Sequence, residues 1–335
     1  MEIFLFDKEK YERLYNCTLY EEGYFNHLKK PNRYVGAIYI SAGLVYECLY
    51  IPCLIAMAGK RFRKLSCYKL MLFLGIIDTL TIPLNAILYG WFALHGNVFC
   101  DYPNLEYISG GLTTALWTAA SMTCLILAFN RLCDLINPRL MILLFHGNRT
   151  YYWFIGPILY FFYFFFFTYP FVYTSANYAG FSNPYVGTVF EAQTNLQYFN
   201  LSLILHNIMV PVLMVLMYTI ISAVVVVKSY RAKSATARLN SPALTKYQKS
   251  TIMQAFLICS VFIIAPIIYD WMNYYGAPWL MVVIGQVCWQ SCHGIAVFIY
   301  ISFNRALREK MMTFIQKPKV HTTSSGQHDD VFNRV

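Results

Sequence analysis

Charged residues are scarce in this chain. Of its 335 residues only 13% are charged, whereas 58% are hydrophobic and 18% are aromatic. Ordinary soluble domains carry roughly 25% charged residues, so the composition excludes that class and indicates an integral membrane protein. A net charge of +10 would suit a nucleic-acid-binding protein if it were spread evenly, but the basic residues are gathered in a few short segments.

Lysine and arginine are absent from residues 70–130, 150–227 and 250–304. Cytoplasmic loops of membrane proteins hold most basic residues, so this alternation predicts an all-α bundle of seven membrane-spanning helices. The N-terminus is then outside and the C-terminus inside, and topology accounts for the net charge without a nucleic-acid partner. The expected spans are residues 35–57, 68–92, 107–132, 151–173, 199–227, 251–275 and 279–303.

The segments outside the expected bundle, residues 34–303, are short. Residues 1–33 form an expected extracellular segment, in which Asn16 begins an Asn-Cys-Thr glycosylation motif. Residues 304–316 alternate apolar and basic side chains, which predicts an amphipathic helix on membrane lipid at the cytoplasmic face. Residues 317–335 are polar and are expected to be a disordered cytoplasmic tail.

The basic loop at residues 228–249 has two interpretations. It is either a solvated connection near anionic lipid or a docking surface for a cytoplasmic partner. With seven spans, the second interpretation is favoured.

The third expected span is rich in small and hydroxyl residues on all sides. Neighbouring helices can approach such residues closely, whereas lipid gains nothing from them, so this helix is expected to be enclosed by protein. Thr113, Trp117 and Arg131 follow helical spacing along one face. That face would link a cavity near one end to a surface at the other.

Other membrane functions are less well supported. The intramembrane residues Glu47, Asp78, His206 and His293 do not cluster in sequence as catalytic groups would. Cys288 and Cys292 are one turn apart among apolar neighbours, which favours packing over a metal site. One half of the chain does not repeat the other, and intramembrane ionisable groups are few. A transporter or channel is therefore the weaker alternative, and no enzyme, cofactor or metal is expected.

Short motifs on the expected spans carry a resemblance. They are Tyr34-Val35-Gly36, Tyr50-Ile51-Pro52-Cys53, Ser66-Cys67-Tyr68-Lys69, Gly75-Ile76-Ile77-Asp78, Ala128-Phe129-Asn130-Arg131, Ile299-Tyr300-Ile301 and Phe303-Asn304. With these motifs in this order along the sequence, the chain resembles the nematode serpentine receptors of class T, a chemoreceptor-like family of G-protein-coupled receptors. The resemblance implies a sensory receptor of the plasma membrane, including the ciliary membrane of sensory neurons, that binds a small molecule and signals through a heterotrimeric G protein. Receptor oligomers are also compatible with it.

Two departures from rhodopsin-like receptors affect the expected mechanism. Asn130 precedes Arg131 where that class usually has an acid, so a weaker neutral contact would hold the arginine at rest. The second outer loop, about residues 174–198, has no cysteine for the usual clamp to the third helix. Cys17 and Cys100 are the cysteines left outside by the topology, and they are the expected disulfide pair.

The expected site residues fall into two groups. Amides on one face of the seventh span would suit either a small polar ligand or interhelical hydrogen bonds. His206 is either a ligand contact or a hydrogen-bonded core histidine. Asp270 is either a binding site for an amine or an acid at the membrane interface. The candidate ligand-binding residues are Thr113, Trp117, His206, Asp270, Gln286, Trp289 and Gln290. The candidates for activation and G-protein coupling are Asp78, Asn130, Arg131, Pro266 and Tyr300.

Overall fold

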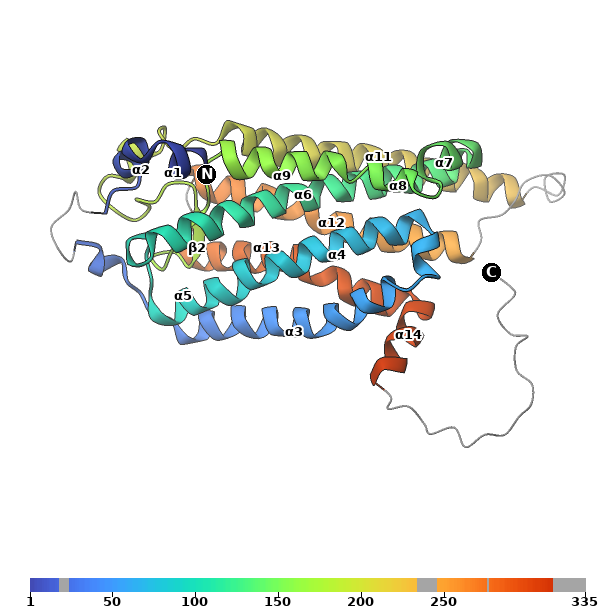
Figure 1. Cartoon of the computed structure of the whole chain (residues 1–335), viewed down its shortest axis with the longest axis horizontal. Coiled ribbons are helices and arrows are strands. Elements are labelled where there is room, and N and C mark those ends of the chain that lie inside the picture. The colour runs from blue at the N-terminus through green and yellow to red at the C-terminus, as the bar shows by residue number, and fades with distance from the viewer. Residues whose placement is uncertain (18–23, 234–245, 276, 316–335) are drawn as a thin grey trace.

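Seven long apolar helices run side by side in a computed structural model of the chain, which describes residues 1–17, 24–233, 246–275 and 277–315 (Figure 1). The predicted number of spans is confirmed. Five spans are single helices, namely α3 (Arg33–Met57), α6 (Pro103–Ile136), α11 (Leu201–Lys233), α12 (Lys246–Tyr275) and α13 (Trp279–Phe303). The second span comprises α4 (Ser66–Ile82), η3 (Pro83–Leu88) and α5 (Tyr89–His95), and the fourth comprises α8 (Arg149–Tyr152) and α9 (Ile155–Phe167).

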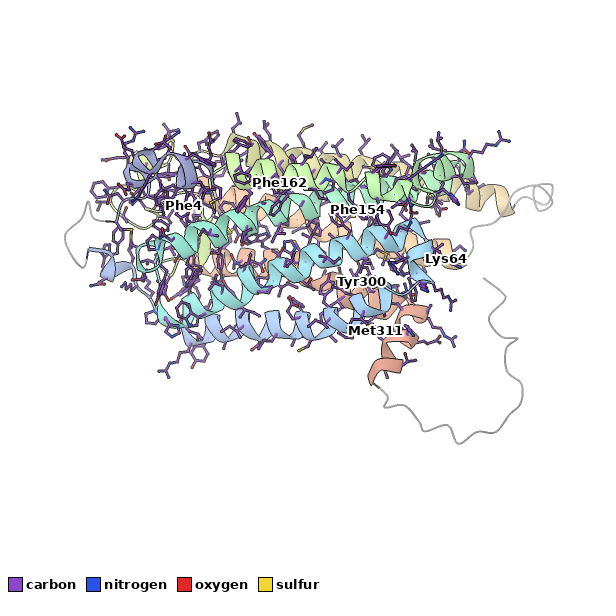
Figure 2. All side chains as sticks on the ribbon, viewed as in Figure 1. Phe4, Lys64, Phe154, Phe162, Tyr300 and Met311 are labelled. Carbon is purple, nitrogen blue, oxygen red and sulfur yellow. A yellow bond between two sulfur atoms is a disulfide. The ribbon has the colours of Figure 1, made fainter. Side chains whose placement is uncertain are left out.

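Short elements close the two ends of the bundle. The end that carries Cys100, called here the Cys100 end, has α1 (Glu2–Phe6), α2 (Lys8–Leu14), η1 (Tyr24–Leu28), η4 (Phe99–Asp101), α10 (Glu191–Thr194), β1 (Val172–Thr174) and β2 (Ala179–Phe181). The opposite, Arg131 end has η2 (Phe62–Lys64), α7 (Pro138–Phe145) and α14 (Arg305–Ile315). Figure 2 shows Phe4 at the first end and Lys64 at the second.

Helix α6 is the most enclosed of the seven spans. Its most apolar stretch is 83% buried, whereas that of the fourth span is 17% buried. The small residues of α6, including Gly110, Gly111 and Ala120, are buried on all sides of the helix. The prediction that protein surrounds this helix is confirmed, because small side chains let neighbouring helices approach closely.

The second span contains a wide helical turn. Pro83 begins the π-helix η3. Proline has no backbone N–H to continue the α-helical ladder, so the chain accommodates it in a wider turn. The span continues as α5 to His95 and ends at Gly96. Gly96 has a positive φ of 72°, the left-handed conformation in which helices commonly end.

The fourth span is shorter than expected. It was predicted to reach Tyr173, but α9 ends at Phe167 and residues 172–174 form strand β1 instead. Strands β1 and β2 pair antiparallel, with Tyr173 opposite Gly180. An apolar run cannot by itself distinguish a buried strand from the end of a helix, and here Pro170 separates the two. The expected all-α fold therefore has one small hairpin.

The C-terminal helix packs back on the bundle. In α14, Leu307 and Met311 are buried, which is the apolar face that the sequence predicted. Its placement on the inner leaflet stays a prediction. The predicted disordered tail and most of the basic loop, residues 234–245, lie outside the described residues.

Candidate functional site: an aromatic cluster and a buried arginine

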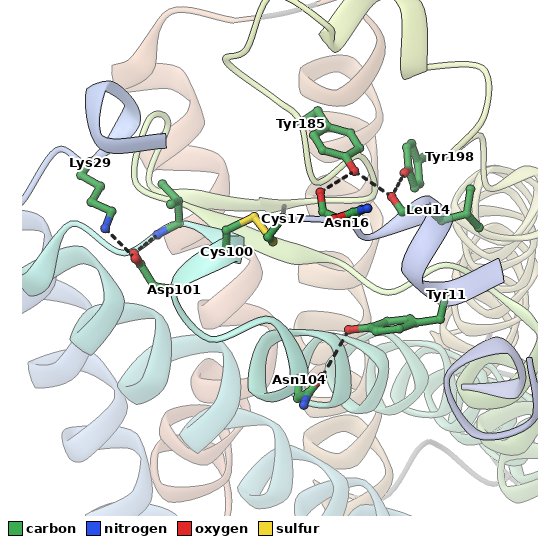
Figure 3. The surroundings of a disulfide bond; sticks show 11 residues. Tyr11, Leu14, Asn16, Cys17, Lys29, Cys100, Asp101, Asn104, Tyr185 and Tyr198 are labelled. Atoms are coloured by element: carbon green, nitrogen blue, oxygen red, sulfur yellow. Dashed lines mark hydrogen bonds and ion pairs between the residues drawn. A yellow bond between two sulfur atoms is a disulfide. The ribbon is translucent and has the colours of Figure 1, made fainter. Parts of the chain in front are cut away.

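The N-terminal segment is fastened across the Cys100 end. A disulfide joins Cys17 to Cys100, with Cα atoms 5.6 Å apart, and Tyr185 donates hydrogen bonds to the carbonyls of Leu14 and Asn16 (Figure 3). The Met1 ammonium donates to two carbonyl oxygens of α9, and burial lowers its pKa to about 6. The acceptor motif at Asn16 includes Thr18, which lies outside the described residues, so glycosylation stays a prediction.

The β1–β2 hairpin packs against the helices at this end of the bundle, and all six of its strand residues are buried. The Glu106 carboxylate accepts the backbone N–H of Tyr173 at 2.9 Å, and Tyr39 donates to the carbonyl of Tyr178 at 3.0 Å. Gly110 lets α6 approach closely, because a Cβ there would lie 1.8 Å from the carbonyl oxygen of Phe171. The hairpin therefore seals the bundle without a disulfide of its own.

Five aromatic side chains gather beneath the hairpin. We call Tyr89, Trp117, Phe171, Tyr269 and Trp289 the Trp289 cluster. The centroid of the Trp289 ring lies 5.2 Å from that of Tyr269, 6.1 Å from Phe171, 6.3 Å from Tyr89 and 6.5 Å from Trp117. These rings come from the hairpin segment and from four helices, so the cluster joins the second, third, sixth and seventh spans.

Side-chain amides adjoin the Trp289 cluster. Gln286 and Gln290 both donate to the backbone carbonyl of Asn85, at 3.1 and 3.0 Å, and Tyr269 donates to Gln286. Asn85 lies in the wide turn of η3, where the helix leaves this carbonyl available to α13. The side-chain amide of Asn85 and the Gln290 carbonyl oxygen are buried and have no hydrogen-bond partner among the described residues. Sequence reasoning did not single out Asn85.

The other predicted ligand residues are directed elsewhere. Asp270 accepts a hydrogen bond from Asn207 on α11 at 2.8 Å, and Asn207 in turn accepts one from the Trp117 indole at 3.3 Å. His206 pairs with Tyr160 of α9 at 3.1 Å, and the Thr113 hydroxyl bonds within its own helix. Thus Trp117, Gln286, Trp289 and Gln290 come together, and Asp270 is linked to Trp117 through Asn207. Thr113 and His206 bind other groups.

Three hydrogen-bonded side chains, Tyr50, Asp78 and His293, lie further from the Cys100 end than the Trp289 cluster does. Both oxygens of Asp78 are hydrogen-bonded, one to Tyr50 at 2.7 Å and the other to the Nδ1 atom of His293 at 2.8 Å. Asp78 and His293 are fully buried. The rings of Trp117 and Phe262 lie edge-on to His293, with centroids 5.9 and 6.0 Å away. Trp117 therefore belongs to the Trp289 cluster and also contacts the deeper group.

Arg131 is held by two contacts at the opposite end. Its guanidinium donates to the Asn130 side-chain oxygen at 2.7 Å, and Asn130 donates to Ser66 of α4 at 3.0 Å. Asp134, one turn further along α6, lies 3.8 Å from the arginine. The expected neutral contact is accompanied by an acid at i+3, which sequence reasoning missed although that spacing places the two side chains on one face.

Asp134 should therefore restrain Arg131 in the resting protein. We expect Asp134→Asn to raise ligand-independent nucleotide exchange by a bound G protein about two- to fivefold, the range of a partly exposed ion pair. Asn130→Asp should lower the same rate, because a charged acceptor holds arginine more strongly than an amide does. Equal exchange rates in both variants at matched surface levels would show that these contacts do not restrain Arg131.

The remaining activation residues are part of the helix core. Pro266 lies inside α12, and the hydroxyl of Tyr300 on α13 is buried without a partner among the described residues. Figure 2 places Tyr300 between the two ends of the bundle, nearer to Lys64 than to Phe4. Their roles in activation stay predictions.

Seven helices long and apolar enough to cross a membrane, with an aromatic cluster near one end and an arginine near the other end of the third, make this a seven-transmembrane protein of the receptor type. The sequence profile of the serpentine type 7TM GPCR chemoreceptor Srt family matches residues 1–324, and the chain belongs to this family. It is 26% identical over 285 residues to serpentine receptor class T-55 of Caenorhabditis elegans, covering 84% of this chain and 74% of that relative. The family is one of G-protein-coupled chemoreceptors, not of enzymes.

Proposed function

We propose that the Trp289 cluster with its adjoining amides is the ligand site, and that the Arg131 end engages a heterotrimeric G protein. The Cys100 end then faces outward at the plasma membrane. The basic residues support this orientation, since those around Lys64 and Arg131 collect at one end and cytoplasmic surfaces are enriched in lysine and arginine.

The proposal rests on a continuous series of side-chain contacts that runs from the Trp289 cluster to the buried Asp78–His293 pair. Trp117 packs with Trp289 in the cluster and with His293 below it, and His293 binds Asp78 of α4. A ligand that moves the cluster therefore acts on contacts between three spans. Receptors can convert such a displacement into a helix rearrangement if the ligand favours one arrangement over another.

Arg131 is the residue to test first. We expect Arg131→Ala to abolish ligand-independent nucleotide exchange in membranes that contain the receptor and an added G protein, because the arginine would contact the G protein when the helices part. Arg139→Ala is the matched control, since Arg139 is an exposed arginine on α7 at the same end. Exchange that persists in Arg131→Ala at equal surface expression, or that disappears equally in both variants, would contradict this role.

A further inference from the structure

The proposed ligand site is made of uncharged groups. The five rings of the Trp289 cluster and the amides of Asn85, Gln286 and Gln290 carry no formal charge. Acids in the same spans bind protein groups outside the five rings: both oxygens of Asp78 bind Tyr50 and His293, and one oxygen of Glu106 accepts from the hairpin backbone. The other Glu106 oxygen is buried without a partner among the described residues. Asp270 follows Tyr269 on α12 but binds Asn207 of α11. A charged ligand among the five rings would thus lose its hydration without an opposite charge inside the cluster itself.

The amides at this site have unused hydrogen-bonding capacity. Asn85 is 0% exposed and Gln290 is 1% exposed. Both polar atoms of the Asn85 side chain and the Gln290 carbonyl oxygen lack a partner among the described residues. A buried polar group without a partner is costly, and a neutral donor or acceptor on a ligand would remove that cost. The site therefore favours a molecule with an uncharged hydrogen-bonding group.

The hairpin lies at the Cys100 end of the bundle, and a groove opens on the side of the bundle. This groove lies between α12 and α13 and has a volume of about 380 Å³. Its lining is mainly apolar and includes Ile264 and Ala265 of α12 and Cys288 of α13. Both helices are membrane spans, and Ile264 at the rim is 55% exposed, so the groove faces lipid.

The groove and the Trp289 cluster adjoin across the same pair of helices. Ala265 of the groove is one helical turn before Tyr269 of the cluster, and Cys288 of the groove directly precedes Trp289. Tyr269 and Trp289 contact each other across the α12–α13 interface, with ring centroids 5.2 Å apart. These two rings are therefore the ones that a molecule passing from the groove to the cluster would have to displace.

We propose that the ligand is a neutral, lipophilic molecule with one uncharged hydrogen-bonding group, and that it enters the Trp289 cluster from the bilayer through the α12–α13 groove. This inference rests on the proposed function of the cluster as the ligand site. It adds the chemical class of the ligand and the route by which the ligand arrives. An apolar molecule would first partition into the membrane, where the mouth of the groove is already accessible.

A direct labelling experiment tests the class of ligand. The probe is 1-octanol bearing a diazirine group, used with the purified full chain in lipid nanodiscs. We expect saturable labelling of peptides that contain Trp289 and of peptides that line the groove. Excess 2-octanone should compete with the probe, whereas octanoate and octylammonium should not. Gln290→Leu should weaken saturable labelling roughly tenfold, the effect of losing one buried hydrogen-bond partner.

A second variant tests the route. Cys288→Phe fills the groove beside the cluster and should slow the onset of labelling at Trp289 several-fold while its final extent is unchanged. Val212→Phe is the matched control, because Val212 on α11 is 56% exposed to lipid and lies outside the groove lining. Equal onset rates in the two variants would overturn the route.

The outcomes separate this inference from the proposed function. Non-saturable labelling in proportion to lipid exposure, or competition by octylammonium that Asp270→Asn removes, would overturn the neutral ligand class. Saturable labelling at Trp289 with no nucleotide exchange in response to the probe would support the ligand class and count against coupling through this site. Because labelling needs no G protein, a failure of signalling cannot be mistaken for a failure of binding.

Discussion

Replacing His293 with leucine should destabilise the folded receptor by about 1 to 3 kcal/mol, the usual cost of leaving a buried polar atom without its hydrogen-bond partner. His293 binds one oxygen of Asp78, and the two side chains are fully buried in the bundle. Leucine would leave that oxygen without a partner in an apolar interior, where water cannot replace the imidazole. The measurement is the thermal unfolding of purified receptor in one detergent, with surface expression as a second readout.

Two further variants show whether the loss comes from Asp78. Adding Asp78→Asn to His293→Leu should recover much of the stability, because a neutral amide is less costly to bury than a carboxylate. Tyr300→Phe is the matched control in the same helix, since its buried hydroxyl has no partner among the described residues. A double variant no more stable than His293→Leu would indicate that packing around the imidazole, and not the carboxylate, determines the effect.

Gly110→Ala should destabilise the hairpin and lower the receptor's stability by about 1 to 3 kcal/mol, the usual cost of overpacking. A Cβ at this position would lie 1.8 Å from the carbonyl oxygen of Phe171, and backbone cannot yield as a flexible side chain does. Because the Phe171 ring packs on Trp289, the change should also alter the Trp289 cluster. Thermal unfolding and tryptophan fluorescence would detect the two effects.

The neighbouring glycine provides a close control. At Gly111 the nearest atom to an added Cβ is 3.7 Å away, which is ordinary contact. Gly111→Ala should therefore be neutral or slightly stabilising, by up to about 1 kcal/mol, because alanine is the better helix former. If both substitutions have the same effect, the hairpin does not depend on the close approach at Gly110.

The sequence was sufficient for the spans because hydrophobicity and the placement of basic residues are local properties. It failed at residues 168–173, where an apolar run continued beyond the helix and into a strand. The strand is buried by its contacts with α6, and such contacts leave no periodic pattern in six residues.

The candidate site was only partly predictable for a related reason. Gln286 and Gln290 share a face of α13, so helical spacing on one element was enough to find them. Asn85 and the pairing of Asp78 with His293 depend on how separate helices are rotated toward each other. Asp78 and His293 are 215 positions apart, and one sequence carries no signal for contact over such a distance.

The wide turn at Pro83–Leu88 has a consequence for comparing receptors of this family. Each extra residue in a helix rotates everything beyond it by about 100°. The ring of Tyr89, the first residue after the turn, therefore faces the bundle only while this turn keeps its additional residue. A relative that lacks one residue between Ile82 and Tyr89 would present a different side of its second helix to the ligand. An alignment of these receptors should allow a single-residue gap in this segment, or it will equate positions that point in different directions.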